Sequence, residues 1–575
     1  MGLREAVMTK KVQVDSVAEA YIELLAARGI DYFFGNGGTD FGPIVEAYAN
    51  RFAKEEMLPK PIPVPHEITA VAMSHGYTMV TGKPQVVMVH TLPGTANAVG
   101  GILNASRSNV PILFTAGRTP ITEGELPGSR DGGIHYSQES FDQGSMVREW
   151  VKWDYELREG ADLEGVVDRA LAISQSEPAG PVFLTLPREV LAAKKQDFTY
   201  SERPRMHAAK DTMPAPELIE EAANVLAAAK NPILIVRDAG RDPGSQKPLV
   251  DLAEFISMPV FESASAYVNF PQSHDLHAGG TAGEHIPTAD VIVVVEADAP
   301  WVQKRTPPSD DATIISIAQD PLYSKIPIRS YRADISLAGA PRLTIAALVD
   351  AIKQIGVDGV AVQKRGTEWA AAHEKRIAAN NARAEAGKDQ SPINKSYFSR
   401  ELSKQLDENS IFVVELGADS SQFQFDIPGD SYSHSPAGGL GWALGAALGA
   451  KLASPERTVV CAVGDGSYTF GVPTAAHITS HMQNLPVLFI VWNNGIWNAV
   501  KNSAKNLNPD GVAAKTDTWA FTALDQQFRY EQICQASGGY GERVDDPAEV
   551  PAAIERALHA VRVEKRQALL NIIGG

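Results

Sequence analysis

Residues 459–500 read VVCAVGDGSYTFGVPTAAHITSHMQNLPVLFIVWNNGIWNAV. Two apolar runs in this stretch, 459–463 and 487–492, are suited to buried parallel strands, and a segment of helical pattern joins them. The first run leads into GDGS (464–467) and the second into NNG (493–495). Because open parallel sheets bind ligands at the carboxyl ends of their strands, the stretch predicts an α/β sheet with both polar clusters at one edge.

The two clusters carry the residue types that hold a phosphate and a cation. Gly464 and Gly466 let the backbone approach a phosphate closely, and the helix that follows, from Ser467, offers free N–H groups. Asp465 and Asn494 supply hard oxygen ligands of the kind that Mg²⁺ prefers. Either cluster alone would be an ordinary turn or cap. The pair, each behind a strong strand, indicates a magnesium–diphosphate site.

The rest of the chain repeats this alternation of apolar strands and helices. It divides into three blocks, and we expect three doubly wound parallel-sheet α/β domains, at residues 1–190, 191–365 and 366–575. Helices are expected at 17–28 and 67–81, and the Lys/Glu/Ala-rich segment 366–388 is interpreted as an exposed helical linker. The strands expected outside 459–500 are 32–35, 85–90, 111–116, 181–186, 231–236, 289–296, 312–317, 411–415 and 568–572.

Charge and composition restrict the possible partners and the compartment. A formal net charge of −17 without a basic run argues against nucleic acid and anionic membranes as partners. No stretch approaches about 18 uninterrupted apolar residues, so no membrane span is expected. Two cysteines in the whole chain, and an N-terminus (MGLREAVMTKK) without the apolar core of a signal peptide, favour a reducing cytoplasm.

The stretch 459–500 resembles the cofactor-binding signature of the thiamine-diphosphate enzymes of the pyruvate decarboxylase and acetolactate synthase superfamily. The resemblance implies that Asp465, Asn494 and the backbone carbonyl of Ile496 bind Mg²⁺. The spacing between Asp465 and Asn494 is slightly longer than the superfamily signature leads us to expect. The extra length falls in TFGVPTAAH (469–477), where we expect a bulged helix start.

A second motif, VPHE (64–67), opens the helix expected at 67–81. A Glu in a first helical turn is favoured by the helix dipole, so by itself Glu67 needs no functional role. The segment through GKP (82–84) nevertheless resembles the first-domain motif of the same superfamily. This resemblance implies that Glu67 binds the aminopyrimidine of thiamine diphosphate and is the main acid/base of the site.

A third motif, PAGGLGWAL (436–444), resembles the segment that precedes GDGS in benzoylformate decarboxylases. The resemblance implies that the carbonyl of Gly438 accepts a hydrogen bond from the cofactor's 4′-amine. It also implies that the bulky Leu440 holds the cofactor in its bent conformation. The alternative without a cofactor role is a glycine-rich helix start that packs closely on the sheet.

The residues expected on the substrate side combine features of two branches of the superfamily. His90 lies where benzoylformate decarboxylases have a His that handles substrate protons, and an imidazole suits general acid/base work near neutral pH. Thr39, in GNGGT (35–39), matches a Ser that contacts the substrate carboxylate, and His274 matches a second active-site His loosely. Gln138 instead resembles a Gln that faces the cofactor in acetolactate synthases.

The resemblance implies a thiamine-diphosphate- and Mg²⁺-dependent enzyme that decarboxylates a 2-oxo acid through an enamine, with possible ligation to an aldehyde acceptor. It also implies pyrimidine-binding, central and diphosphate-binding domains, and a homodimer or homotetramer in which Glu67 and Asp465 of one site come from different subunits. An acetolactate-synthase-type carboligase, a 2-hydroxyacyl-CoA lyase and a catalytically inert nucleotide- or flavin-binding relative stay open. So does FAD or ADP in the central domain.

Overall fold

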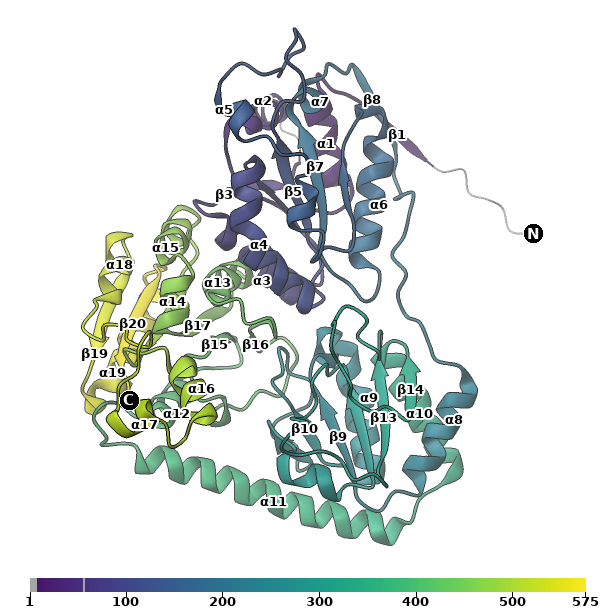
Figure 1. The fold of residues 1–575 in the computed structure, drawn as a ribbon, viewed down its shortest axis with the longest axis vertical. Coiled ribbons are helices and arrows are strands. Elements are labelled where there is room, and N and C mark those ends of the chain that lie inside the picture. Colours follow the sequence, from purple (N-terminus) through teal and green to yellow (C-terminus); the bar gives the residue numbers. More distant parts are fainter. Residues whose placement is uncertain (1–7, 55–56) are drawn as a thin grey trace. The chain divides into compact units, whose positions relative to one another are not determined.

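The computed structural model describes residues 8–54 and 57–575 (Figure 1). Residues 1–7 of the N-terminal segment, for which we expect no signal peptide, lie outside this part. The described chain forms three six-stranded sheets and a two-stranded antiparallel ribbon of β1 (Thr9–Gln13) and β8 (Asp197–Ser201). It divides into two compact units. The first comprises residues 1–209, 434–542 and 557–571, and the second 210–433, 543–556 and 572–575.

The first sheet has the strand order β3-β2-β4-β5-β7-β6, with parallel pairing throughout. Its strands are β2 (Tyr32–Asn36), β3 (Lys60–Pro63), β4 (Val86–Val89), β5 (Leu113–Arg118), β6 (Asp154–Glu156) and β7 (Val182–Pro187). The helices here are α1 (Val17–Ala27), α2 (Gly42–Phe52), α3 (Glu67–Thr81), α4 (Thr91–Arg107), α5 (Ile134–Ser137), α6 (Leu163–Gln175) and α7 (Arg188–Ala192). The four predicted apolar strands are confirmed. The outermost two, β3 and β6, were not predicted because they are short edge strands without an apolar run.

The second sheet has the order β11-β10-β9-β12-β13-β14 and is parallel throughout. Its strands are β9 (Pro232–Val236), β10 (Val260–Glu262), β11 (His277–Gly279), β12 (Val291–Val295), β13 (Thr313–Ala318) and β14 (Ile335–Ala338). Helices α8 (Pro216–Ala227), α9 (Gln246–Ile256) and α10 (Pro341–Ile355) lie around it (Figure 1). The predicted strands β9, β12 and β13 form its centre, where both faces are buried.

The third sheet has the order β16-β15-β17-β18-β20-β19. Its strands are β15 (Ser410–Glu415), β16 (Ser431–Ser433), β17 (Thr458–Gly464), β18 (Val487–Asn493), β19 (Tyr540–Val544) and β20 (Ala568–Ile573). The associated helices are α12 (Lys395–Gln405), α13 (Trp442–Ala453), α14 (Asp465–Phe470), α15 (Pro473–Met482), α18 (Tyr530–Ala536) and α19 (Val550–Arg562). Together, the three parallel sheets confirm the α/β fold class.

The helix between β17 and β18 differs from the prediction. Instead of one helix with a bulged start, the chain forms two helices, because α14 ends at Phe470 and α15 begins at Pro473. Val472, between them, has a left-handed backbone (φ 50°), and proline at position 473 favours the start of a new helix. The additional residues are therefore accommodated as a helix break beyond GDGS.

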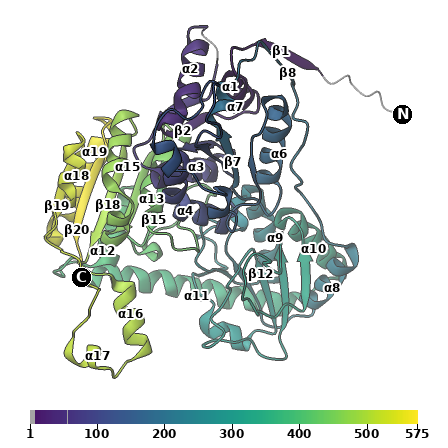
Figure 2. The same cartoon turned by 45° about the horizontal axis from the view of Figure 1, so that its top comes forward.

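Two further helices were not predicted. The chain leaves β18 and forms α16 (Asn498–Leu507) and α17 (Val512–Thr516) before it returns towards α18. In Figure 2 these helices project away from β18 and β20, and none of their residues is buried. Val500, Leu507 and Val512 are among their exposed side chains, so these helices add nothing to the buried core of the described residues.

The predicted linker helix is confirmed and begins earlier than expected. It forms α11 (Gly359–Ala386), whose N-cap Asp358 accepts hydrogen bonds from the backbone N–H groups of Val360 and Ala361. Most of α11 is exposed and polar, whereas the side chain of Arg365 is buried against backbone carbonyls of the second unit. Among the described residues, no helix is both long and apolar enough to cross a membrane.

Helices α3 and α13 pack against each other through glycines. A Cβ on Gly76 would lie 2.1 Å from the carbonyl oxygen of Ala446, and one on Gly449 would lie 2.0 Å from that of Met73. Since real Cβ atoms do not approach a carbonyl this closely, the backbone contact requires glycine at both positions. This contact holds the helix that begins with Glu67 at a fixed distance from the helix that precedes β17.

We predict that Gly76→Ala destabilises the protein by about 1–3 kcal/mol, because the added methyl must push the two helices apart. Gly100→Ala is the matched control, since Gly100 also lies inside a helix but its nearest non-neighbour atom is 4.0 Å away. There, alanine should be neutral or stabilising by up to about 1 kcal/mol. Urea unfolding of both variants measures the difference, and equal midpoints would contradict the packing argument.

Candidate active site

Glu67 is the first residue of α3 and its side chain is almost completely buried. His66 caps the helix, since its Nδ1 accepts from the backbone N–H of Ile68 (3.2 Å). Nδ2 of Asn97, on α4, donates to Oε2 of Glu67 (3.2 Å). A Cβ on Gly94 would lie 3.2 Å from Oε1, so glycine there leaves the second carboxylate oxygen free of a side chain. Asn97 of α4 therefore fixes the carboxylate through Oε2, and no side chain of α4 covers Oε1 at position 94.

His90 directly precedes α4, and its ring is held by a buried carboxylate. Its Nδ1–H donates to Oδ1 of Asp40 (2.5 Å). This hydrogen bond raises the pKa of His90 above its ordinary value. Burial lowers the pKa in part, whereas the negative charges of Asp40 and Glu67 raise it further. A Cβ on Gly38 would overlap the ring of His90 at 2.1 Å, so the close approach depends on glycine.

Gln138 and Thr39 join this group. Nε2 of Gln138 lies 3.4 Å from Nε2 of His90, the ring nitrogen that does not face Asp40. Thr39 immediately precedes Asp40 and its side chain is exposed. Strands β2 and β4 pair in parallel up to Asn36 and Val89, so the loops after both strands leave the same edge of the sheet. The structure thus brings four of the predicted residues, Glu67 included, to this part of the first unit.

The GDGS and NNG clusters lie side by side, as predicted, because β17 and β18 are parallel neighbours with Gly464 opposite Trp492. Asp465 is buried and joins the two loops. Its Oδ1 accepts from the N–H of Gly466 (2.9 Å) and its Oδ2 from the N–H of Gly495 (2.8 Å). Burial raises the pKa of Asp465, and the backbone N–H groups oppose that rise.

The oxygen donors near Asp465 fit a hard cation. Oδ1 of Asn494 accepts from the N–H of Ile496 (3.1 Å), and Ile496 pairs with Ala523 in an isolated antiparallel bridge. A carboxylate, a side-chain amide and a backbone carbonyl match the preference of Mg²⁺ for oxygen. A cation beside Asp465 would also remove the electrostatic cost of burying that carboxylate. The residues present are therefore compatible with the predicted magnesium site.

Glycines keep the backbone around this group accessible. A Cβ on Gly466 would lie 2.4 Å from the ring of Trp497, so only glycine fits beneath that indole. Gly464 precedes α14, and Ser467 is buried within it. Upstream, Gly438 has a left-handed backbone (φ 65°) and is exposed, while Leu440 is half-buried.

Three polar residues in these contacts were not predicted. Asp40 holds His90, Asn97 holds Glu67, and Asn104 brackets Gly439 by accepting from its N–H (3.1 Å) and donating to its carbonyl (2.8 Å). Asn97 and Asn104 lie seven residues apart on α4, which corresponds to one helix face. The seven-residue spacing of Asn97 and Asn104 in the sequence could have indicated their shared helix face. The sequence around Asp40 gives no indication that Asp40 is buried.

His274 lies in the second unit. Its Nε2 is 3.1 Å from Oε1 of Glu254, and its Nδ1 accepts from the N–H of Leu276 (3.1 Å). The ring also packs on Phe270. These contacts account for both ring nitrogens, and the role expected for His274 stays a prediction.

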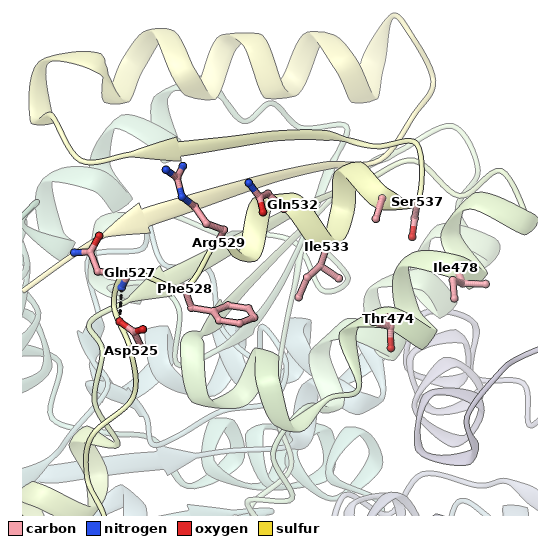
Figure 3. Close-up of a pocket in the computed structure, with 10 residues that line it drawn as sticks. Thr474, Ile478, Asp525, Gln527, Phe528, Arg529, Gln532, Ile533 and Ser537 are labelled. Carbon is pink, nitrogen blue, oxygen red and sulfur yellow. Dashed lines mark hydrogen bonds between the residues drawn. The ribbon is translucent and has the colours of Figure 1, made fainter.

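A cavity of about 700 Å³ between α15 and α18 contains none of the predicted residues (Figure 3). Figure 3 shows Phe528, Ile533 and Ile478 among its lining side chains, together with Asp525, which accepts from the N–H of Gln527. The segment that contributes Asp525 follows the bridge between Ile496 and Ala523. The cavity therefore lies outside the group of predicted site residues.

Three family models match the chain: the N-terminal thiamine pyrophosphate (TPP) binding domain at residues 15–146, the central domain at 219–348 and the C-terminal TPP binding domain at 417–572 of thiamine pyrophosphate enzymes. The chain belongs to the thiamine pyrophosphate enzymes. Glu67, His90 and Gln138 fall within the first matched segment of this TPP enzyme, and Asp465 and Asn494 within the last.

Individual relatives of this TPP enzyme include both branches suggested by its motifs. It is 26% identical to benzoylformate decarboxylase from Pseudomonas aeruginosa, over 91% of this chain and 94% of that protein. It is 25% identical to the acetolactate synthase isozyme 3 large subunit from Escherichia coli, over 95% of this chain and 93% of that protein. The crystal structure of benzoylformate decarboxylase from Polynucleobacter necessarius has the same fold (TM-score 0.76, 21% identity, 97% and 98% coverage).

We predict that Asp40→Asn in this TPP enzyme lowers the pKa of His90, because the hydrogen bond to Asp40 is the main cause that raises it. The titration is followed by NMR with ¹³C-labelled His rings, and His90→Gln identifies the resonance. Asp142→Asn is the control, because Asp142 pairs with Arg148 at the surface. An unchanged His90 titration in Asp40→Asn would show that the pair does not set this pKa.

Proposed function

We propose that this TPP enzyme is a Mg²⁺-dependent 2-oxo acid decarboxylase that can also ligate the resulting fragment to an aldehyde. One observation carries the proposal: a histidine with a raised pKa is held by Asp40 in the same group as Glu67 and Gln138. A protonated imidazole is a suitable general acid for releasing an aldehyde. The similarity to benzoylformate decarboxylase supports this assignment.

The cofactor would be held by the loops around Asp465. Its bound cation would be Mg²⁺, with Asp465, Asn494 and the carbonyl of Ile496 as the protein's ligands. Backbone N–H groups of the glycine-containing turn, from Gly464 to Ser467, would face the diphosphate. When bound, thiamine diphosphate supplies a nucleophilic carbon and an electron sink for the carbon–carbon bond next to the carbonyl.

Glu67 would exchange a proton with the aminopyrimidine ring. Its fixation by Asn97 orients the carboxylate, and its uncovered oxygen is available to a ring nitrogen. The carbonyl of Gly438 would accept from the ring's amine, and Leu440 would hold the cofactor in its bent conformation.

His90 would protonate the carbon that has lost carbon dioxide. Asp40 holds the imidazole by Nδ1, which leaves Nε2, next to Gln138, as the atom that delivers the proton. Thr39 is exposed in the adjoining turn, and its hydroxyl would bind the substrate carboxylate. His274 would act as a second histidine on the substrate side of the site.

We further propose three domains, at residues 1–190, 191–365 and 366–575, and a homodimer or homotetramer in the cytoplasm. In this assembly Glu67 of one subunit would serve the cofactor bound by Asp465 of the partner. FAD or ADP in the central domain stays open.

A second candidate is an acetolactate-synthase-type carboligase, favoured by the position of Gln138 beside His90 and by the relative from Escherichia coli. Proton NMR of the holoenzyme with a panel of 2-oxo acids separates the two. Free aldehyde from phenylglyoxylate supports the decarboxylase. Acetolactate from pyruvate without free aldehyde would replace it with the synthase, and no turnover of any 2-oxo acid would contradict both.

Glu67→Gln should reduce turnover by about 10²–10⁴-fold, the range that general acid/base groups contribute. The fold should be preserved, since the amide can still accept from Asn97. Glu46→Gln, at an exposed position of α2, is the control and should retain full activity. The rates are measured with the best substrate of the NMR panel, and near-wild-type turnover in Glu67→Gln would remove this role.

A further inference from the structure

A cavity of about 430 Å³ lies at the edge of the second sheet, where β11 and the residues that follow it meet α11. All of it belongs to the second compact unit. None of the residues predicted for the active site lines it. Its lining includes Phe261, Ala278, Thr281, His285, Trp369 and Arg376.

Arg376 is the distinctive group in this cavity. Its Nη2 donates to the carbonyl of His277 (3.0 Å) and also lies 3.0 Å from Nδ1 of that ring. Its Nε is buried and has no hydrogen-bond partner among the described residues. Nor does any carboxylate in the described part of the chain form an ion pair with it. Burial lowers the pKa of Arg376, and no neighbouring charge opposes the effect.

The surrounding histidines do not neutralise this charge. Nε2 of His277 donates to Oε2 of Glu262 (3.2 Å), so its Nδ1 is free to accept from Arg376. Nδ1 of His373 donates to the carbonyl of His277 (3.0 Å). Glu262 is therefore engaged with His277, and the guanidinium is left as an uncompensated positive charge.

A second arginine of the same helix shows the difference. Arg365 is buried as well, but its N–H groups donate to the carbonyls of Ser257, Ile256 and Lys230. It fastens α11 to the domain and has no need of a ligand. Arg376 is half-buried, lines the cavity and has no carboxylate partner among the described residues, and a guanidinium of this kind gains most from a carboxylate or phosphate.

Another part of the lining is aromatic. The rings of His285 and Trp369 are in contact (centroids 5.0 Å apart), and Phe261 lies against both. Glu284, at the rim, is exposed and adds a negative charge. This charge disfavours a multiply charged anion, while the aromatic wall favours a flat apolar group.

We propose that this cavity binds a singly charged aromatic carboxylate, with its carboxylate on Arg376 and its ring against Trp369 and His285. The volume lies at the lower end of that of small-molecule sites, about 300–1,000 Å³, which suits a single ring rather than a dinucleotide. The cavity of Figure 3 offers no comparable site, because its Arg529 is paired with Glu531.

The test is a calorimetric titration of the full-length holoenzyme with benzoate, acetate, inorganic phosphate and AMP. Benzoate should bind most tightly, and Arg376→Met should weaken it by at least about tenfold. Lys375→Met, at an exposed position of the same helix, should leave the affinity unchanged. Arg376→Lys, which keeps the positive charge, should retain part of the affinity for benzoate. This variant answers the question if Arg376→Met does not fold.

Benzoate could also enter the active site, so its position is checked separately. Anomalous scattering from 4-bromobenzoate in crystals should place bromine next to Trp369. Bromine found only elsewhere would overturn the proposal, as would equal benzoate affinity in the wild type and Arg376→Met. Tighter binding of AMP or phosphate than of benzoate would also overturn it, and would identify a phosphate site instead.

Discussion

The structure depends most on the buried carboxylate of Asp465. It accepts N–H groups from Gly466 and Gly495, which belong to the loops after two neighbouring strands. Burial raises its pKa, so the folded chain carries an electrostatic cost that a bound cation would relieve. The same residue thus joins β17 to β18 within the fold and prepares the site proposed for magnesium. The long apolar strands behind it make the position rigid.

A comparable arrangement governs the other half of the proposed site. Asp40 holds His90, and Asn97 holds Glu67, so each reacting group has a partner that fixes its orientation. Glycines at positions 38 and 94 provide the space for these close contacts. Catalytic groups held in this way lose little entropy when a substrate arrives. Substitution of a supporting residue should therefore alter the pKa or geometry of its partner before it alters the fold.

The sequence predicts those elements of the molecule that are determined by residues close to one another in the chain. The start of α3 at Glu67 and the strands on both sides of GDGS follow from caps, apolar runs and turn residues that are adjacent in the chain. Asp40 could not be predicted, because its burial depends on glycines of separate loops and strands. The short edge strands and the exposed helices α16 and α17 also escape prediction, since tertiary context rather than hydrophobic pattern determines them.

The central claim is that Asp465 anchors thiamine diphosphate through a divalent cation. The most direct measurement is calorimetric titration of thiamine diphosphate into the wild-type protein and Asp465→Asn, each with Mg²⁺ and with a chelator. We expect tight binding only for the wild type with Mg²⁺, and a loss of at least about 100-fold in the other three cases. Equal binding by Asp465→Asn, or binding that does not need Mg²⁺, would contradict it.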